Sequence, residues 1–385
     1  MLKSLKIKNL LSFGPEGVDV ELRPLNVLVG PNGSGKSNFL SAVRILQAAP
    51  TDLSMPIRSS SSFPEDWKRS DSILPSEISA DLDFHSDYIG TYYLALNFIN
   101  GYGIEIHSEV FKSDIFTFFE RFKNNARIYF LKMDMENVEN VRIEDSKSVM
   151  SEVKDFRPSN YSISASLLKS LRIYTGRPWQ QGNASWLPQK IDVESKFLSE
   201  DYSNLAVVLH NLNNFVNIES LLLSKLKRFY PRSERLFTDF VGGLVQIFIR
   251  ESVGKSVANI PASRLSDGTL SFLCLLTILC HPTPPPLICI EEPELGLHPD
   301  VLPMIAELLV EASKRTQLII TTHSDLLVSA IGDLMPEAIL VCEHTSEEGT
   351  TIERPNPERL KKWLQQDDMS LGEVWLRGAI GGTLY

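Results

Sequence analysis

The sequence has little of several features that mark particular classes of protein. It has only four cysteines in 385 residues, with no Cys-x-x-Cys pair, which argues against a metal ribbon or a disulfide framework. No apolar run approaches the roughly 20 residues that cross a bilayer. The charged N-terminus lacks the apolar core of a signal peptide. We therefore expect a cytoplasmic protein with no membrane partner and with reduced, buried cysteines.

An excess of positive charge is also missing. The formal net charge is −10, which argues against a uniformly positive surface but leaves room for a local basic patch that contacts DNA. Lys225–Arg235 is the densest basic segment and contains two aromatic residues. It fits either phosphate contact with base stacking or a solvated helix end. A weaker cluster, formed by Arg121, Lys123 and Arg127, leaves the same two alternatives.

Hydrophobic residues make up 43% of the chain, and their spacing predicts three zones. Residues 1–50 alternate as strands and then follow a helical period; residues 51–255 form an inserted region, β-rich and then helical; residues 256–385 alternate strands with helices. The elements expected in the first zone are strands at Leu5–Asn9, Val18–Leu22 and Leu25–Val29 and a helix at Ser37–Ala48.

The second zone opens with a Ser/Pro-rich loop, Thr51–Pro75, and has a hairpin turn at Asn100 and Gly101. The strands expected here are Ile78–Phe84, Tyr92–Ile99, Ile104–Phe111, Ala126–Met133 and Leu244–Arg250, and the helices are Ser164–Ile173 and Asn204–Phe229. Because no heptad pattern is sustained, we expect no long coiled coil.

The third zone predicts a mostly parallel sheet with helices on its faces, because its strands and helices alternate. The strands are Leu287–Ile290, Gln317–Thr321 and Ala338–Val341, and the helices follow Ser266 or cover Pro299–Arg315 and Asp325–Ile331. The strand–loop–helix of the first zone fits the same α/β fold, so we predict one α/β core split in sequence by the inserted α+β region.

Residues 30–37 read Gly-Pro-Asn-Gly-Ser-Gly-Lys-Ser and match the phosphate-binding loop G-x-x-x-x-G-K-[ST], with an apolar strand before and a helix after. Glycines let backbone N–H groups reach phosphates at the helix N-terminus. Lys36 would bind the β- and γ-phosphates of ATP, and Ser37 would bind Mg²⁺. A glycine-rich helix cap is the alternative. The expected ATP-binding residues are Gly30, Pro31, Asn32, Gly33, Ser34, Gly35, Lys36, Ser37 and Asn38.

Two carboxylates follow the apolar strand Leu287–Ile290. Ligands of open α/β sheets bind where strands end. Glu291 would hold Mg²⁺ or its waters, and Glu292 would orient and deprotonate the attacking water. A solvated acidic turn is the alternative.

Two further turns carry polar residues. Ser266 precedes an apolar helix and can cap it, and the helix end can also bind an anion. His323 follows a second apolar strand and would lie beside the other strand-end residues. Taken alone, Ser266 is better explained as an ordinary helix cap and His323 as a loop histidine.

The order of these motifs resembles the ABC-type ATPase heads of the SMC/RecF-like group. Closer still, the chain resembles the bacterial AAA-family ATPases of the OLD and RecF-like kind that are often found in phage-defence operons. The matching segments are Leu5–Phe13, Gly30–Ser37, Leu265–Thr269, Ile290–Pro299 and Thr321–Ser324. The resemblance implies a split ABC-type P-loop ATPase head with an inserted region.

The resemblance also implies roles for single residues. Ser266 and Gly268 match the signature motif, which contacts the γ-phosphate of ATP held by another subunit. Glu292 matches the catalytic glutamate, His323 matches the switch histidine, and Leu295–His298 matches the loop that crosses the dimer interface. The implied unit is a head-to-tail homodimer, open to higher assembly, with two ATP molecules between the heads.

The chain departs from the pattern in three places. Glu291 replaces the usual Walker B aspartate, so contact with Mg²⁺ could run through water. Asp267 replaces a small or polar residue of the signature. The glutamine of the family's Q-loop has no clear counterpart in the sequence, since Gln47 lies inside the first helix and comes too early.

Three functions remain open. The first is an ATPase that serves as motor or sensor of an antiphage defence complex with a separate effector protein such as a nuclease. The second is an ATP-dependent regulator that holds a partner toxin or nuclease inactive. The third is a RecF-like DNA-binding repair ATPase.

The tail Ser370–Gly382 could dock a partner through Trp375 or pack on its own head.

Overall fold

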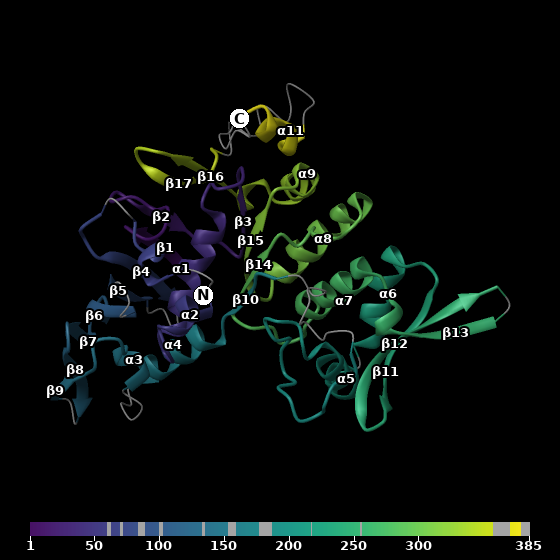
Figure 1. Ribbon diagram of the computed structural model, residues 1–385, viewed down its shortest axis with the longest axis horizontal. Coiled ribbons are helices and arrows are strands. Elements are labelled where there is room, and N and C mark those ends of the chain that lie inside the picture. Colours follow the sequence, from purple (N-terminus) through teal and green to yellow (C-terminus); the bar gives the residue numbers. More distant parts are fainter. Residues whose placement is uncertain are drawn as a thin grey trace. The chain divides into compact units, whose positions relative to one another are not determined.

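The computed structural model describes residues 1–59, 63–69, 72–83, 89–99, 103–132, 135–152, 159–176, 187–216, 218–254, 256–356 and 370–378. The chain divides into two compact units (Figure 1). Unit 1 comprises Met1–Leu171, Glu337–Met369 and Glu373–Tyr385, and unit 2 comprises Arg172–Pro336 with Ser370–Gly372.

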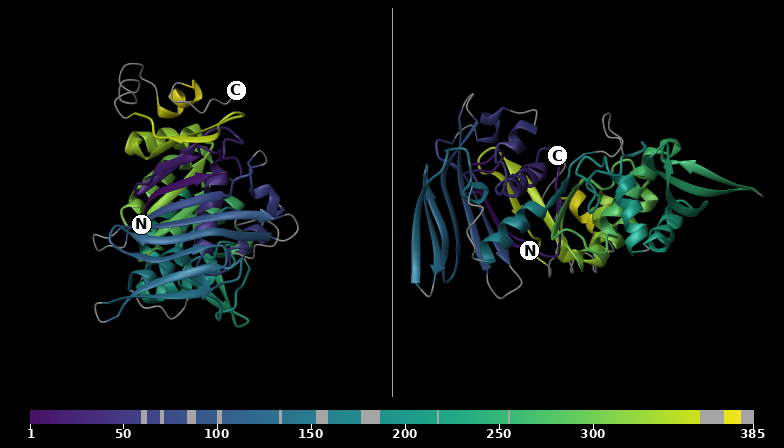
Figure 2. Two further views of the ribbon diagram at one scale, coloured as in Figure 1. Left: turned by 90° about the vertical axis from the view of Figure 1, so that its left-hand side faces the viewer. Right: turned by 90° about the horizontal axis from the view of Figure 1, so that it is seen from below.

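Unit 1 contains an antiparallel sheet of eight strands in the order β2-β1-β4-β5-β6-β7-β8-β9, whose long strands lie side by side in Figure 2. Buried and half-buried residues alternate along β4, because successive side chains of a strand point to opposite faces. The strands are β1 (Leu2–Lys8), β2 (Val18–Glu21), β4 (Ser76–Asp83), β5 (Ile89–Ile99), β6 (Gly103–Ser113), β7 (Thr117–Phe122), β8 (Asn125–Lys132) and β9 (Met135–Arg142).

A second strand group in unit 1 leads into the phosphate-binding loop. All five residues of β3 (Leu25–Val29) are buried, and β16 (Ile339–Thr345) pairs with β3 in parallel. β17 (Gly349–Glu353) pairs with β16 antiparallel. The helices of this unit are α1 (Lys36–Ala48), α2 (Met55–Ser59), α3 (Val149–Glu152) and α4 (Ser159–Ser170).

Unit 2 is built around three parallel strands in the order β10-β14-β15. Glu291 at the end of β14 lies opposite Thr321 of β15, so the carboxyl ends of the two strands meet at one edge. Helix α8 packs against α7, α9 and β15. The elements are β10 (Arg172–Tyr174), β14 (Leu287–Glu291), β15 (Gln317–Thr322), α7 (Asp267–Leu279), α8 (Leu302–Ser313) and α9 (Asp325–Leu334).

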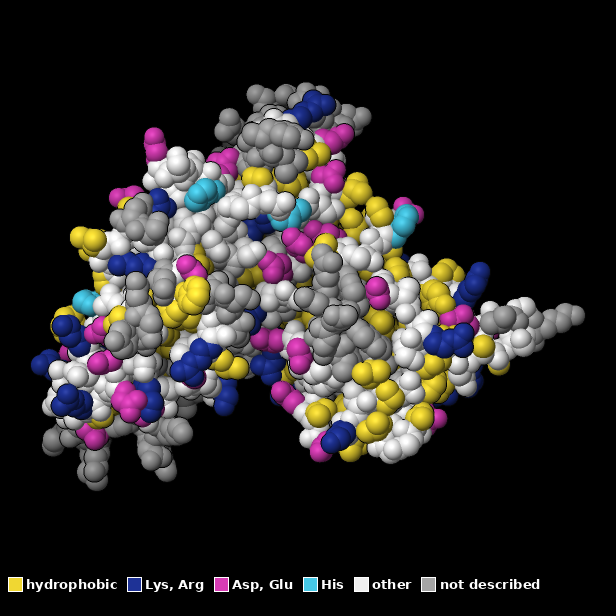
Figure 3. Space-filling model, in the orientation of Figure 1, with side chains coloured by type: hydrophobic (Ala, Val, Ile, Leu, Met, Phe, Trp, Pro, Cys, Tyr) yellow, Lys and Arg dark blue, Asp and Glu magenta, His cyan; other side chains and the backbone are white. Residues whose placement is uncertain are grey.

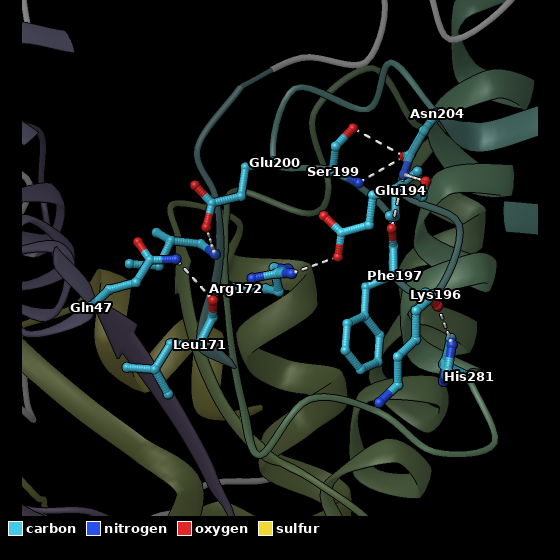
Figure 4. A network of polar contacts seen from close by, with 12 residues as sticks. Gln47, Leu171, Arg172, Glu194, Lys196, Phe197, Ser199, Glu200, Asn204 and His281 are labelled. Carbon is cyan, nitrogen blue, oxygen red and sulfur yellow. Dashed lines mark hydrogen bonds and ion pairs between the residues drawn. The ribbon is translucent and has the colours of Figure 1, made fainter. Parts of the chain in front are cut away.

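The rest of unit 2 carries two helices and a small antiparallel sheet, β11-β12-β13. The loop before α5 contacts β10 through two acidic residues (Figure 4). Glu194 forms an ion pair with Arg172 at 3.1 Å, and Glu200 accepts a hydrogen bond from the Ile173 amide. The elements are α5 (Leu205–Val216), α6 (Glu219–Phe229), β11 (Ser233–Val241), β12 (Leu244–Val253) and β13 (Ser256–Pro261).

Most of the predicted elements are confirmed, including the apolar stripe of α1 and the strand–helix alternation of the third zone. The prediction of no long coiled coil is also confirmed for the described helices, since none exceeds 13 residues. The hairpin turn at Asn100 and Gly101 lies outside the described residues. The division at residues 50 and 255 stays a prediction.

Three predictions are wrong. Asn204–Phe229 is two helices that part after Val216, where asparagines and β-branched residues lower helix propensity. The helix expected to reach Ile173 ends at Ser170, because the next residues pair with β14. The expected loop Thr51–Pro75 contains α2 and a 3₁₀ turn, whose buried Ile57 and Trp67 anchor it.

The cysteines are buried and free, as predicted. Burial raises the pKa of the Cys342 thiol to about 12 and that of Cys280 to about 11, which keeps both protonated and unreactive at neutral pH. No described helix has the length and hydropathy needed to cross a lipid bilayer.

The C-terminal segment packs on its own chain. Helix α11 (Leu371–Leu376) begins beside α9, and the Gly372 amide donates to Ser329 Oγ at 3.1 Å. Trp375 is fully buried, which agrees with the packing alternative and removes this side chain as an exposed anchor for a partner.

We predict that Gly372→Ala lowers stability by about 1–3 kcal/mol, the usual cost of overpacking. An added Cβ would lie 2.2 Å from the Asp325 carbonyl oxygen, and a backbone atom cannot easily move away. Gly176→Ala is the matched control, because nothing lies within 4 Å of its Cβ position. Equal denaturant midpoints for the two variants would contradict this packing.

Candidate nucleotide-binding and catalytic sites

The phosphate-binding loop of unit 1 has the backbone that its glycines require. Gly33 and Gly35 have φ values of 80° and 101°, in the left-handed region that glycine adopts without strain. A Cβ on Gly30 would lie 2.3 Å from the Cys342 carbonyl oxygen. The loop therefore tolerates no larger residue at Gly30 and has open space above Gly33, where nothing lies within 4 Å of its Cβ position.

Lys36 is the charged group of this loop. Only 5% of the residue is exposed, and its Nζ donates to the carbonyl oxygens of Gly30 and Pro31 at 2.8 and 2.9 Å. The ammonium also lies 3.4 Å from Ser34 Oγ. Burial of a charge costs stability unless the charge is compensated, so this position suits an anionic ligand.

Two residues that the sequence analysis did not single out, Ser12 and Thr350, form hydrogen bonds at the phosphate-binding loop. Thr350 Oγ1 lies 3.0 Å from the Ser34 carbonyl oxygen and 2.7 Å from Ser12 Oγ. Asn38, predicted to contact the nucleotide, donates from Nδ2 to the same Ser12 oxygen at 2.7 Å. Ser12 lies within Leu5–Phe13, one of the segments that match the family, so the sequence could have indicated it. The sequence could not have indicated Thr350, because only the fold brings β17 to the loop.

The residues present fit a magnesium–triphosphate ligand. Gly35 precedes α1, and no described side chain caps that helix, which leaves its first N–H groups oriented toward an anion. Lys36 supplies a positive charge, and Ser37 is exposed at the first turn of the helix. These are the groups that a phosphate-binding loop uses for phosphates and Mg²⁺.

In unit 2, the ends of β14 and β15 bring together two of the predicted catalytic residues. His323 Nε2 lies 3.1 Å from Glu292 Oε1, and both side chains are about a third exposed. The Glu292 amide donates to the Thr321 carbonyl oxygen at 2.9 Å. Glu292 has φ 47°, an uncommon conformation for a non-glycine residue that is often found at functional sites.

Glu291 ends β14 and is half-buried beside Glu292. Glu291 and Glu292 line a small pocket together with Tyr202 and Ser271. A carboxylate at such a pocket can accept a proton from a water molecule that enters it.

Glu294 lies in the same turn and was not singled out from the sequence. Its Oε1 accepts hydrogen bonds from Thr322 Oγ1 and, at 3.1 Å, from the His323 amide. Its Oε2 is buried and has no hydrogen-bond partner among the described residues. Burial raises the pKa of Glu294, and these hydrogen bonds oppose the increase.

The signature-like turn of unit 2 has the cap that the sequence predicts. Ser266 Oγ accepts from the Thr269 amide at 3.3 Å at the start of α7. Ser266 is exposed and Gly268 is half-buried. A Cβ on Gly268 would lie 2.9 Å from the carbonyl oxygen of Gly296. Gly268 thus lets the segment matching the family's interface loop approach the exposed end of α7.

The basic clusters are largely neutralised. Within Lys225–Arg235, three side chains pair with acids: Lys225 with Glu311, Arg228 with Glu307 and Arg235 with Glu219, at 2.6–2.9 Å. Acidic and basic side chains are interspersed on the face shown in Figure 3. In the second cluster, Arg121 is buried and donates to four main-chain carbonyls. These ion pairs and the burial of Arg121 leave fewer free cations for phosphate contact in both clusters.

Asp81 and Asp83 lie on β4 and contact neighbouring strands. Asp81 accepts from Ser4 and Thr91, and Asp83 pairs with Lys3. No group of three or more potential metal ligands occurs among the described residues. β10 ends at the same sheet edge as β14.

Comparison of the chain with solved structures supports this fold. The chain matches the Smc head bound to the C-winged helix domain of ScpA, with a TM-score of 0.56 and 16% identity over 94% of this chain and 99% of that one. It also matches the Smc head domain with an extended coiled coil, bound to the C-terminal domain of ScpA, from Pyrococcus furiosus. That match has a TM-score of 0.55 and 13% identity over 96% and 99% of the two chains. No curated protein matches the chain in sequence.

The chain has the fold of Smc head domains, as predicted, and its residues 30–37 carry the phosphate-binding loop of P-loop proteins. A family profile assigns the chain more narrowly, since it matches residues 25–170 and 180–329, more than half of the sequence. The chain belongs to the family described as "AAA domain, putative AbiEii toxin, Type IV TA system".

Proposed function

We propose that the protein hydrolyses ATP in the presence of Mg²⁺, with Lys36 binding the phosphates and Glu292 activating water. The observation that supports this most strongly is the glycine loop, which holds a buried ammonium at 2.8–2.9 Å from its own carbonyls. When ATP binds, its phosphates would replace these carbonyls as partners of Lys36. Bound Mg²⁺ would neutralise phosphate charge, with Ser37 and Glu291 as its proposed protein contacts.

Glu292 is proposed as the general base. A carboxylate takes a proton efficiently only when it is positioned within hydrogen-bond reach of the attacking water. Glu292 lines a small pocket at the end of β14, which supports this role. His323 would hold that carboxylate through the 3.1 Å contact. The same histidine could then respond to the γ-phosphate, as the resemblance implies.

We further propose that ATP joins two copies head-to-tail. The exposed Ser266 at the start of α7 supports this, because an exposed helix N-terminus can meet a phosphate that another molecule holds. In such a pair each ATP contacts Lys36 of one copy and Ser266 of the other. Hydrolysis would then release the pair.

The proposed role is that of a motor or sensor in a defence complex with a separate effector protein. The family description, which names a putative toxin and a toxin–antitoxin system, supports the second candidate: an ATP-dependent regulator of a partner toxin or nuclease. The ion pairs of Lys225, Arg228 and Arg235 weigh against direct DNA binding by this segment. The cytoplasmic location stays a prediction.

Phosphate release from ATP by the purified chain tests the proposal. We expect multiple turnovers that require Mg²⁺ and stop when EDTA is added. Release that is independent of Mg²⁺, or that stops after one phosphate per chain, would contradict catalysis. A turnover far below the range of about 1–100 s⁻¹ that is typical of kinases would favour the regulator.

A further inference from the structure

Glu294 holds an unusual position for a carboxyl side chain. One of its oxygens accepts two hydrogen bonds, while the other is buried with no partner among the described residues. Burying a polar atom without a partner costs free energy. A carboxylate that served stability alone would not leave one buried oxygen without a partner. We therefore ask what the two hydrogen bonds of the other oxygen, Oε1, do for the site.

Those two bonds tie together the turns that carry the catalytic candidates. Glu294 belongs to the turn that starts at Glu292, where the Leu295 amide donates to the Glu292 carbonyl oxygen at 3.0 Å. Its two donors, the Thr322 hydroxyl and the His323 amide, belong to the turn that ends β15. Glu294 therefore fixes the backbone of His323 relative to the backbone of Glu292.

The connection continues into helix α9. Thr322 Oγ1, which donates to Glu294, also accepts from the Ser324 amide at 3.0 Å. Ser324 in turn caps α9 by accepting from the Leu327 amide at 3.2 Å. Thr322 is fully buried, so its hydroxyl has few alternative orientations. The start of α9, and His323 just before it, are thus linked to Glu294 Oε1 through Thr322.

We propose that Glu294 is a positioning residue for hydrolysis: through Thr322 and the His323 amide, it holds the His323 ring against the Glu292 carboxylate. The inference rests on the proposed function, because it assigns Glu294 a role in the work of Glu292 and His323. A displacement of about 1 Å at a reacting group can cost about 100-fold in rate. Loss of the Oε1 acceptor should therefore lower kcat and leave ATP binding by Lys36 unaffected.

The test measures kcat, KM for ATP and thermal stability for a matched set of variants. Glu294→Ala should lower kcat by about 10–100-fold and leave KM within about threefold. Glu294→Gln keeps an acceptor oxygen of the same reach and should retain kcat within about threefold. Thr322→Val should lower kcat in the same direction. Thr321→Val is the control for it, because the buried Thr321 hydroxyl has no hydrogen-bond partner among the described residues.

A double-mutant cycle with His323→Ala decides whether Glu294 acts through the histidine. We expect Glu294→Ala to lower kcat by less than about threefold when His323 is already alanine. The same loss in both backgrounds, or equally low activity of the Gln and Ala variants, would overturn the proposal. If Glu294→Ala does not fold, Thr322→Val decides, and a kcat equal to that of Thr321→Val would overturn it.

Failure of this inference differs from failure of the proposed function. If the wild-type chain releases no phosphate over repeated turnovers, the proposed function itself is wrong. If Glu292→Gln hydrolyses ATP at the wild-type rate, only the role of Glu292 as the base is wrong. If Glu292→Gln and His323→Ala lose turnover while Glu294→Ala retains it, only the positioning role is wrong.

Discussion

Replacement of Lys36 by alanine is expected to weaken ATP binding by about 10–100-fold. A hydrogen bond to a charged group contributes about 1.5–3 kcal/mol, and each 1.4 kcal/mol corresponds to a factor of ten in affinity. Because the ammonium is buried in the loop, its removal also relieves a desolvation cost. The variant should therefore fold with unchanged or increased stability while losing ATP affinity.

Titration with a fluorescent ATP analogue, together with thermal melting, checks this expectation. Lys6→Ala is the matched control, since Lys6 forms an exposed ion pair with Asp19 at 2.9 Å, and such pairs contribute little. Equal ATP affinity for Lys36→Ala and Lys6→Ala would rule out the loop as the phosphate site.

Glu292→Gln is expected to lower kcat by about 100-fold or more, the usual contribution of a general base. The amide has nearly the same shape as the carboxylate but cannot accept the proton of the attacking water. ATP binding should stay within about threefold of the wild type, because the phosphate contacts belong to Gly30–Ser37. The variant should also accumulate as the ATP-bound pair, since hydrolysis no longer releases it.

Phosphate release and light scattering with ATP provide the two readouts. Glu307→Gln is a suitable control, because Glu307 pairs with Arg228 on the surface of α8. If Glu292→Gln turned over ATP as fast as Glu307→Gln, Glu292 would not be the base.

The spacing of residues within single segments was enough to predict the phosphate-binding loop and the strand ends that carry the catalytic candidates. Gly30–Ser37 carries its own loop geometry, and the apolar runs Leu287–Ile290 and Gln317–Thr321 form the buried parallel strands from which Glu292 and His323 follow. Their 3.1 Å contact was predictable as proximity, because parallel strands end at a shared edge. The Ser266 cap was predictable from the residue type.

The rest depended on contacts between distant segments. Thr350 reaches the phosphate loop through pairing of β16 with β3, and no spacing rule in the sequence encodes that meeting. In the sequence, nothing separates Glu294 from the other acidic residues of its turn. Only the hydrogen bonds from the Thr322 hydroxyl and the His323 amide distinguish it. β10 is a three-residue strand, too short to show a period, and its pairing with β14 displaced the predicted helix end.

The most direct test of the account mixes two inactive variants, Lys36→Ala and Ser266→Arg. Each alone should release almost no phosphate, because the proposed site takes Lys36 from one copy and Ser266 from the other. A head-to-tail pair of the two variants has one intact site. An equal mixture should therefore recover about a quarter of the wild-type rate if pairing is random. A mixture that stays as inactive as its components would contradict a site shared between two copies.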